Sequence, residues 1–351
     1  MMLYLVRYDE IALKSEHVRK KWEEVLIKNI EQAIDCSISR ERGRIWVYSE
    51  DEKAKEKLRK IFGITSFSPC ISCELGNLKH EAMKFAGEVL KDKKSFALRV
   101  KRVGKHSFTS IDVARELGEE IINKIPIKVD LKSPEKEVFI EIRENRCYIY
   151  DEIIPGVGGL PLGVEGKVIS LFSGGIDSGV ATWLMMKRGC EVMLVHFYIS
   201  KESYESACLC YEVLKEYNPE LKLIKIEHSD FLRKIDKQNY TCILCKREML
   251  RKAQEIAIEI GAKGIVTGDS LGQVASQTLD NLFVISQAIY YPIYRPLIGM
   301  DKQEIISLAR KIGTYEKYLE APQLSCPYAP KKPVVKAELD KVLEIEKCLK
   351  R

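Results

Sequence analysis

A glycine-rich turn between an apolar strand and an apolar helix is the segment best suited to chemistry. Residues 168–178 have the sequence Val-Ile-Ser-Leu-Phe-Ser-Gly-Gly-Ile-Asp-Ser, in which a β-branched strand leads into a short loop of serines and glycines. Glycines let the backbone approach a ligand, and main-chain N–H groups at a helix N-terminus attract an anion. The turn therefore predicts a polyphosphate site; the alternative is an ordinary glycine turn that caps a helix.

The loop pattern narrows the kind of phosphate chemistry. It lacks the Gly-Lys-Ser/Thr ending of a P-loop and the G-x-G-x-x-G fingerprint of a dinucleotide site. It matches instead the pyrophosphate-binding loop of ATP pyrophosphatases, which cleave ATP between the α- and β-phosphates and leave AMP on the substrate. Because Asp177 would repel a polyanion directly, we expect it to act through Mg²⁺.

Two strand ends are expected beside this loop, because ligands bind beyond the carboxyl ends of parallel strands. His196 and Phe197 end one apolar strand and are placed to contact an adenine. A single histidine at a strand end is more often structural, which is the alternative for His196. The polar, glycine-bearing stretch 267–278 follows the other strand.

Three cysteines are candidates for metal or sulfur chemistry. Cys242 and Cys245 form a C-x-x-C before an expected helix over 246–260, and Cys326 is the third. A C-x-x-C can be a redox pair, half of a zinc site or two ligands of a cluster. Cys70 and Cys73 fall on opposite faces of an expected strand, so we interpret them as core residues.

A basic cluster lies between residues 91 and 105, where Asp92 is the one acidic residue. Seven cations minus one acid give an excess of six, equal to the net charge of +6 of the whole chain. Such a cluster attracts a phosphate backbone; a solvated lysine-rich face is the alternative. The cations are Lys91, Lys93, Lys94, Arg99, Lys101, Arg102 and Lys105.

The elements that must position these residues fall into two halves. The first 75 residues predict strands over 2–8, 44–48 and 66–73 and helices over 16–34 and 53–62, an order typical of a ferredoxin-like α+β unit. A second α+β unit is expected from helices over 77–91 and 110–124 and strands over 96–102, 137–142 and 147–153. Ser110 with Asp112 is the expected cap of the helix over 110–124.

Residues 155–163 contain four glycines and two prolines and form the clearest boundary in the chain. Beyond it, apolar strands alternate with longer helices, the pattern of a doubly wound parallel sheet and an α/β fold class. The expected strands are 167–172, 191–197, 222–227 and 263–266, and the expected helices are 177–188, 203–216 and 246–260.

Several protein classes are disfavoured. No run of about 18 apolar residues exists, and the N-terminus lacks the features of a signal peptide. We therefore expect a cytoplasmic protein with no membrane association. The 11 cysteines, an odd number in a long chain, disfavour a disulfide framework.

Several motifs together resemble the ThiI-type tRNA 4-thiouridine synthetases. They are Ser173–Ser178, Thr267–Thr278, Arg295–Ile306, residues 7–14 and 62–69, and Arg99–Phe108. The last resembles the THUMP RNA-binding domain of that family; one departure is Asp9, where members usually carry glycine. The resemblance implies a ferredoxin-like domain over 1–75, a THUMP domain over 76–154, a linker over 155–166 and an ATP-pyrophosphatase domain over 167–351.

The resemblance also implies which residues are needed for adenylation, which bind ATP and which bind RNA. Asp177 and Lys302 correspond to the residues needed for adenylation; the alternative for Lys302 is an ion pair with Glu304 or Asp301 at a helix start. The implied ATP-binding residues are Leu171, Phe172, Ser173, Gly174, Gly175, Asp177, Ser178, His196, Phe197, Lys246, Gly268 and Gln277. The implied RNA-binding residues are Arg99, Lys101, Arg102 and Lys105.

The implied reaction replaces the C4 oxygen of uridine 8 in tRNA with sulfur, through an adenylate that sulfur then displaces. Relatives of the type expected here, without a rhodanese domain, carry cysteines at the positions of Cys242, Cys245 and Cys326. These are implied to be catalytic, either as ligands of an iron–sulfur cluster or as a persulfide with a resolving thiol. The implied partners are tRNA and a sulfur donor, either sulfide or the persulfide of a cysteine desulfurase, and a homodimer is compatible with the resemblance.

Two other function classes share some of these features. An amide synthetase or a different tRNA-thiolating enzyme also adenylates its substrate on a Ser-Gly-Gly-x-Asp-Ser loop, although an amide synthetase needs neither the RNA-binding unit nor the C-x-x-C. A catalytically inactive RNA-binding protein is disfavoured because Asp177 and Lys302 are both present.

Overall fold

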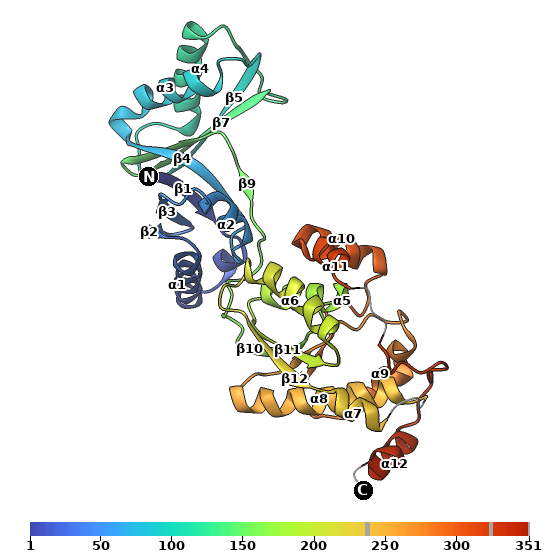
Figure 1. Cartoon of the computed structure of the whole chain (residues 1–351). Helices are drawn as coiled ribbons and strands as arrows, with labels where there is room; N and C mark the ends of the chain where they lie inside the picture. The colour runs from blue at the N-terminus through green and yellow to red at the C-terminus, as the bar shows by residue number, and fades with distance from the viewer. Residues whose placement is uncertain (236–238, 323–325, 350–351) are drawn as a thin grey trace. The chain divides into compact units, whose positions relative to one another are not determined.

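The structure is a computed structural model that describes residues 1–235, 239–322 and 326–349 (Figure 1). The chain forms two compact units. Unit 1 comprises Met1–Arg19, Ile30–Lys60 and Ile64–Gly158, and unit 2 comprises Lys20–Asn29, Ile61–Gly63 and Gly159–Arg351.

Unit 1 is built on one mixed sheet of nine strands in the order β2-β3-β1-β4-β8-β7-β5-β6, with β9 paired to β4. The strands are β1 (Met2–Arg7), β2 (Cys36–Glu41), β3 (Arg44–Ser49), β4 (Ser66–Glu74), β5 (Ser95–Val103), β6 (Lys128–Val129), β7 (Lys136–Arg143), β8 (Arg146–Tyr150) and β9 (Ile154–Pro155). The helices of the N-terminal half are η1 (Glu10–Leu13), α1 (Glu16–Ala33), α2 (Ala54–Lys60), η2 (Leu75–Asn77), α3 (Leu78–Val89) and α4 (Ser110–Lys124).

The long strand β4 joins the two α+β halves of this sheet, since it pairs with β1 along its first part and with β8 along its second. Helices α3 and α4 cover one face of the second half through a core that includes Phe96, Leu117 and Ile140. Each half of the sheet therefore has the α+β composition that the sequence predicted for it.

Two details of unit 1 differ from the prediction. The edge strand β2 was not expected, because the alternation of Cys36 and Ile38 with serines covers only four residues and is followed by charged, exposed positions. Helix α4 begins at Ser110, but its cap is Thr109, whose side chain accepts a hydrogen bond from Asp112 N while Asp112 accepts from Thr109 N in return. Asp112 was therefore correctly assigned to the cap and Ser110 was not.

Unit 2 contains a five-stranded, fully parallel sheet in the order β12-β11-β10-β13-β14. Its strands are β10 (Lys167–Leu171), β11 (Glu191–Tyr198), β12 (Lys222–Glu227), β13 (Ile265–Val266) and β14 (Ile293–Tyr294). Its helices are α5 (Ile176–Lys187), α6 (Lys201–Lys215), α7 (Ser229–Lys234), α8 (Thr241–Ile260), η3 (Ala275–Gln277), α9 (Leu279–Ser286), α10 (Lys302–Ile312), α11 (Thr314–Glu320) and α12 (Leu339–Leu349).

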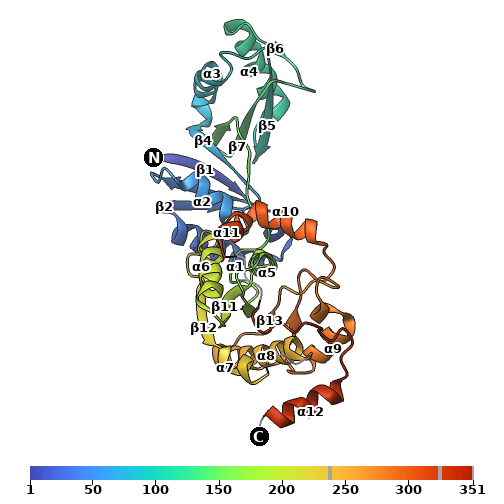
Figure 2. The same cartoon turned by 45° about the vertical axis from the view of Figure 1, so that its right-hand side comes forward.

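Helices cover both faces of the parallel sheet, as the doubly wound prediction requires (Figure 2). Helices α5, α6, α10 and α11 contact one another on one face. Helices α8 and α9 cover the other face, over a core that includes Ile169, Val195 and Ile265. No helix within the described residues is long and apolar enough to cross a membrane.

Helix α8 starts five residues earlier than expected. The N–H groups of Ile243 and Leu244 already donate to the carbonyl of Tyr240, so the first helical turn forms before Lys246. The C-x-x-C therefore lies inside the helix and not ahead of it. Since residues three apart share a helix face, Cys242 and Cys245 lie on the same side of α8.

Candidate active site

The glycine loop joins β10 to α5 at the carboxyl edge of the parallel sheet. Gly174 has a φ of +80°, and a Cβ atom placed there would lie 2.4 Å from the backbone nitrogen of Ala207. Only glycine fits this position, which presses the loop against α6. Within the loop the Ser178 hydroxyl donates to Gly175 O at 3.0 Å, and Gly175 N donates to Ser173 Oγ at 3.3 Å. These bonds fix the loop conformation at the helix N-terminus.

The predicted adenine contact, His196, is buried at the end of β11. Its Nδ1 lies 2.9 Å from the carbonyl oxygen of Phe172 and therefore donates to it. Burial lowers the pKa of His196, so the ring is neutral and its Nε2 is an acceptor. Among the described residues, the buried polar atoms without a partner include His196 Nε2 and Gln277 Oε1. Both belong to the predicted ATP-binding set.

Asp177 and Lys302 meet at the start of α5 and α10. Lys302 Nζ donates to Asp177 Oδ1 at 2.7 Å. With its amide oriented to satisfy both neighbours, Gln273 donates to Asp177 Oδ2 at 3.1 Å and accepts from Lys302 Nζ at 3.1 Å. The alternative for Lys302, an ion pair with Glu304 or Asp301, is not what the structure contains. The side chain of Asp301 instead caps α10 by accepting from the backbone N–H of Gln303 and Glu304.

A second charged cluster, separate from that of Asp177 and Lys302, surrounds the buried carboxylate of Asp269. Asp269 is 5% exposed, and its oxygens lie 2.7 Å from Lys246 Nζ and 3.3 Å from Arg295 Nε. Thr267 Oγ1 also donates to it at 2.7 Å. Burial alone would raise the pKa of Asp269, but Lys246 and these hydrogen bonds hold it below its ordinary value. The ionised carboxylate therefore fixes two cations at the edge of the sheet.

Gly268 brings this cluster to the loop. A Cβ atom at Gly268 would lie 2.9 Å from Asp177 C and 2.9 Å from Ser178 N, so only glycine allows the two backbone segments to touch. The turn after β13 and the start of α5 are thereby held in contact. The residues predicted to bind ATP from β10, β11, α8 and β13 thus gather at one edge of one sheet.

The three candidate cysteines lie in one neighbourhood. Burial raises the pKa of the Cys242 thiol, and Cys326 raises it further. Burial raises the pKa of Cys245 to about 12, with added contributions from Cys326 and Cys242. Cys245 Sγ also lies 3.3 Å from Nε2 of the buried His228. Cys326 is exposed and is therefore the most accessible of the three.

The described residues contain no group of three or more histidine, cysteine or acidic side chains arranged around a single metal ion. The described side chains therefore form no preformed ligand set for a zinc ion or for a cluster. The residue types, three thiols of which Cys326 is exposed, are those that ligate iron–sulfur clusters.

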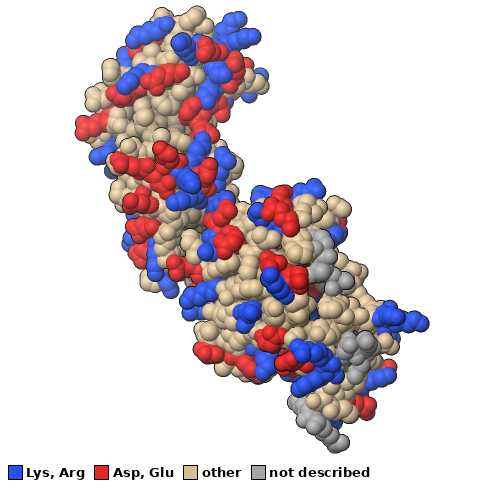
Figure 3. All heavy atoms as spheres, viewed as in Figure 1, with Lys and Arg blue, Asp and Glu red and all other residues tan. Residues whose placement is uncertain are grey.

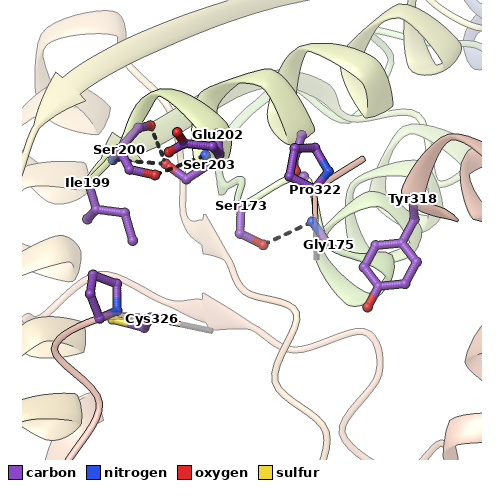
Figure 4. A pocket seen from close by; sticks show the side chains of 12 residues that line it. Ser173, Gly175, Ile199, Ser200, Glu202, Ser203, Tyr318, Pro322 and Cys326 are labelled. Carbon is purple, nitrogen blue, oxygen red and sulfur yellow. Dashed lines mark hydrogen bonds between the residues drawn. The ribbon is translucent and has the colours of Figure 1, made fainter. Parts of the chain in front are cut away.

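A cavity of about 410 Å³ is lined by both the glycine loop and Cys326 (Figure 4). Its walls come from the glycine loop, the start of α6 and the segment around Cys326. Figure 4 shows Cys326 on the far side of the cavity from Ser200 and Ser203. The described lining residues are Ser173, Gly174, Gly175, Ile199, Ser200, Glu202, Ser203, Ser206, Tyr318, Pro322, Cys326 and Pro327.

The predicted RNA-binding residues lie in unit 1, on β5 and the loop that follows it. Lys101 and Lys105 are exposed, whereas Arg99 is half-buried and donates to Glu137 at 2.7 Å. Arg102 Nη1 donates to Gly104 O at 3.1 Å and lies 3.2 Å from His106 Nδ1. On the face shown in Figure 3, cations and carboxylates of unit 1 are interspersed. Part of the basic cluster is therefore paired within the protein.

Sequence reasoning missed four polar residues of the site: Gln273, Asp269, Arg295 and His228. The first three lie inside the motifs 267–278 and 295–306, so their motifs were found but their roles were not. Their partners are distant in the chain, as with Lys302 and Asp177, which are 125 positions apart. His228 follows β12 and has no local signal that marks it.

The parallel sheet, the glycine loop and its linked cations together define an ATP-pyrophosphatase domain, here preceded by ferredoxin-like and THUMP domains. The family described as "Thiamine biosynthesis protein (ThiI)" matches residues 163–350. The ThiI ferredoxin-like domain matches residues 3–68, and the THUMP domain matches residues 74–152. The chain belongs to the ThiI family.

Relatives cover nearly the whole chain. A probable tRNA sulfurtransferase of Methanocaldococcus jannaschii is 41% identical over 99% of this chain and 97% of its own length. One from Saccharolobus islandicus is 43% identical over 99% of this chain and 96% of its own length. The crystal structure of a 4-thiouridine synthetase in complex with RNA and bound ATP has a TM-score of 0.92 at 33% identity, covering 100% of this chain and 95% of that one.

Proposed function

We propose that the protein is an ATP-dependent tRNA sulfurtransferase that adenylates uridine 8 of tRNA and replaces its C4 oxygen with sulfur. The observation that carries this proposal is the single cavity lined by both the glycine loop and Cys326. An enzyme that only forms an adenylate needs the loop but no thiol beside it. The similarity to a 4-thiouridine synthetase bound to RNA and ATP supports the same activity.

The loop and its neighbours are proposed to bind ATP. Backbone N–H groups at the start of α5 receive the phosphates, and His196 Nε2 and Gln277 Oε1 are the buried acceptors available to the adenine amino group. Leu171, Phe172, Phe197 and Gly268 complete the proposed adenosine wall. Lys302 and Lys246 stabilise negative charge that builds on the phosphoryl group during transfer.

Mg²⁺ is proposed to bind at Asp177, whose carboxylate oxygens are the ligand type that this ion prefers. When bound, the ion neutralises charge on the phosphates. Asp177 Oδ1 and Oδ2 are engaged by Lys302 and Gln273, so the same side chain also orients the lysine. The exposed cations Lys101 and Lys105, with Arg102 and Arg99 beside them, are proposed to contact the tRNA backbone.

Cys242, Cys245 and Cys326 are proposed to deliver the sulfur. These residues would hold an iron–sulfur cluster, which supplies an open iron for an incoming sulfide; the alternative is a relay in which one thiol carries a persulfide and Cys326 resolves it. The high pKa of Cys245 makes it the least suited of the three to act as a free nucleophile.

Nucleoside analysis tests the function directly. Anaerobically purified protein is incubated with tRNA, ATP, Mg²⁺ and sulfide, and 4-thiouridine is expected at position 8 only when ATP is present. Each of Cys242→Ser, Cys245→Ser and Cys326→Ser should block thiolation while ATP-dependent pyrophosphate release persists. Visible absorbance that all three substitutions weaken identifies the cluster. Protein without this absorbance that thiolates tRNA only when a cysteine desulfurase with cysteine replaces sulfide identifies the relay, because the desulfurase transfers a sulfur that is already at the persulfide level. Pyrophosphate release without any thiolated nucleoside would instead favour another adenylating enzyme.

A further inference from the structure

The start of α6 is held rigidly against the glycine loop. At Gly174 the loop backbone lies so close to Ala207 that a Cβ atom would come within 2.4 Å of its nitrogen. The first turn of α6 is closed by Ser200 and Ser203, whose side chains bond to each other's main chain at 3.2 and 3.3 Å. Side chains of this turn therefore have a fixed position relative to the phosphate site.

The cavity that these elements line contains a negatively charged side chain, which is unexpected beside a loop proposed to bind phosphates. Of its described lining residues, Glu202 is the one with a charged side chain. Its pKa lies below the ordinary value, because hydrogen bonds from its own backbone N–H and from Ser200 stabilise the carboxylate. A carboxylate disfavours a polyphosphate in this part of the cavity and favours a ligand that presents an N–H group.

Uracil presents such a group next to the atom that reacts. When the O4 atom attacks the α-phosphorus of ATP, an O4–P bond forms, the bond to pyrophosphate breaks, and pyrophosphate leaves with that electron pair. The ring would then be cationic unless N3 loses its proton. Transfer of the N3 proton to a carboxylate leaves a neutral ring with a C4=N3 double bond.

We propose that this cavity receives the target uracil and that Glu202 is the catalytic base that accepts its N3 proton. The proposal rests on the proposed function and adds the residue that removes the N3 proton as the O4–P bond forms. In this position the base has the glycine loop on one side and Cys326 on the other, which are the sources of the phosphoryl group and the sulfur. When a hydrosulfide ion displaces AMP at C4, the AMP leaves with the C4–O4 bond pair, the proton of the hydrosulfide moves to N3, and Glu202 releases the proton that it accepted to solvent.

Glu202→Gln provides the test, because it keeps the size of the side chain and removes the base. Pyrophosphate release that depends on tRNA should fall about a hundredfold, the scale of a lost general base. The affinities for ATP and tRNA should change by less than about threefold, and the melting temperature should be unchanged because Glu202 is exposed. Glu205→Gln is the matched control, since Glu205 lies on the same helix, pairs with Lys201 at 3.6 Å and does not line the cavity.

A tRNA whose uracil N3 is more acidic distinguishes a catalytic role of Glu202 from a structural one. In tRNA transcribed with 5-fluorouridine, N3 loses its proton more readily, so the defect of Glu202→Gln should shrink while the wild-type rate changes little. Equal defects on both tRNAs, or a variant as fast as the wild type, would overturn the role of Glu202. Failure of the wild-type protein to form 4-thiouridine would contradict the proposed function itself. Equal defects on both tRNAs, or a fast variant, would contradict only the role of Glu202.

Discussion

Glu141 in unit 1 and Asp269 in unit 2 are buried carboxylates that each hold two cations, and the two clusters differ in what surrounds them. In unit 1, Glu141 is 1% exposed and lies 3.0 Å from Arg44 and 2.7 Å from Arg143. In unit 2, Asp269 is 5% exposed and contacts Lys246 and Arg295. Burial alone would raise the pKa of each carboxylate, but the cations hold both below their ordinary values.

The position in the sheet separates the two roles. Glu141 lies within β7. Arg143 comes from the end of the same strand and Arg44 from β3 in the other half of the sheet, so the cluster joins the two halves. Asp269 lies just beyond β13, at the edge where the glycine loop ends, and Gly268 beside it touches the start of α5. The same electrostatic unit is therefore expected to stabilise the fold in one place and to position cations for phosphoryl transfer in the other.

The largest effect on pyrophosphate release is expected from Asp177, whose backbone Gly268 brings next to the Asp269 cluster. Asp177→Ala should reduce pyrophosphate release at least about a thousandfold, because Lys302 loses its partner and the phosphates lose a metal ligand. The affinity for tRNA, measured by filter binding, should stay within about threefold. Asp280→Ala, an exposed position at the start of α9, is the control. Near-normal release from the Asp177 variant would show that the loop does not bind the reacting phosphates.

Asp269→Asn tests whether the unit 2 cluster positions its cations for catalysis. Pyrophosphate release per folded molecule should fall about a hundredfold, because Lys246 is no longer held by an ionised carboxylate. Stability should also fall, since two cations lose their partner. Asp269→Glu should recover part of the rate. A rate that follows only the folded fraction would place this cluster in the same structural class as Glu141.

The exposed cations of unit 1 should behave additively and not as a fixed cluster. Changing Lys101, Arg102 and Lys105 together to glutamate should weaken tRNA binding about tenfold at moderate salt and reduce the salt slope by about 0.7–0.9 for each lost phosphate contact. Reversal of Lys91, Lys93 and Lys94, of which Lys93 already pairs with Glu135, is the comparison set. Unchanged binding and slope in the first variant would favour the solvated-face alternative.

The smallest effect on chemistry is expected from the Glu141 cluster. Glu141→Gln should lower the free energy of unfolding by about 3 kcal/mol, because two arginines lose a buried partner, while pyrophosphate release per folded molecule stays unchanged. The wild-type contribution is present above the ordinary carboxyl pKa of 4.5 and is lost as pH falls through the lower folded value. Denaturation curves of the two proteins should therefore converge in acid. A rate defect in this variant would remove the contrast with Asp269.

How much the sequence could predict depended on how local each signal is. The strand, loop and helix around Ser173–Ser178 are contiguous, so their geometry and chemistry followed from residue order alone. Strand β2 has one exposed face and a second face on which only Cys36 and Ile38 are half-buried, so its apolar alternation is too short to be distinguished from a loop. Asp269 resembles any loop aspartate in the sequence; its burial and its partners, 23 and 26 positions away, arise only from packing.

The role of Glu202 in the cavity could not be predicted from the sequence for the same reason. Glu202 lies in the first turn of α6, where acidic residues are expected for the helix dipole alone. Its place in the wall beside Cys326 depends on the close contact between Gly174 and Ala207, which no periodic pattern encodes. Residues that act through distant partners therefore need coordinates, whereas residues that act through a contiguous loop do not.

Helix α8 is stabilised by a contact whose second partner is synthesised much later than the helix itself. Arg247, which is 1% exposed, directs its guanidinium to Glu346 on α12 at 2.7 Å, and the two residues are 99 positions apart. During synthesis at about 5–20 residues per second, the ribosome reaches Glu346 roughly 5–20 seconds after Arg247. Throughout this interval the helix that carries Cys242 and Cys245 lacks the counter-ion of its buried arginine. The thiol site of a nascent chain is therefore expected to mature only once α12 has been made, which leaves newly synthesised protein more open to oxidation than the finished molecule.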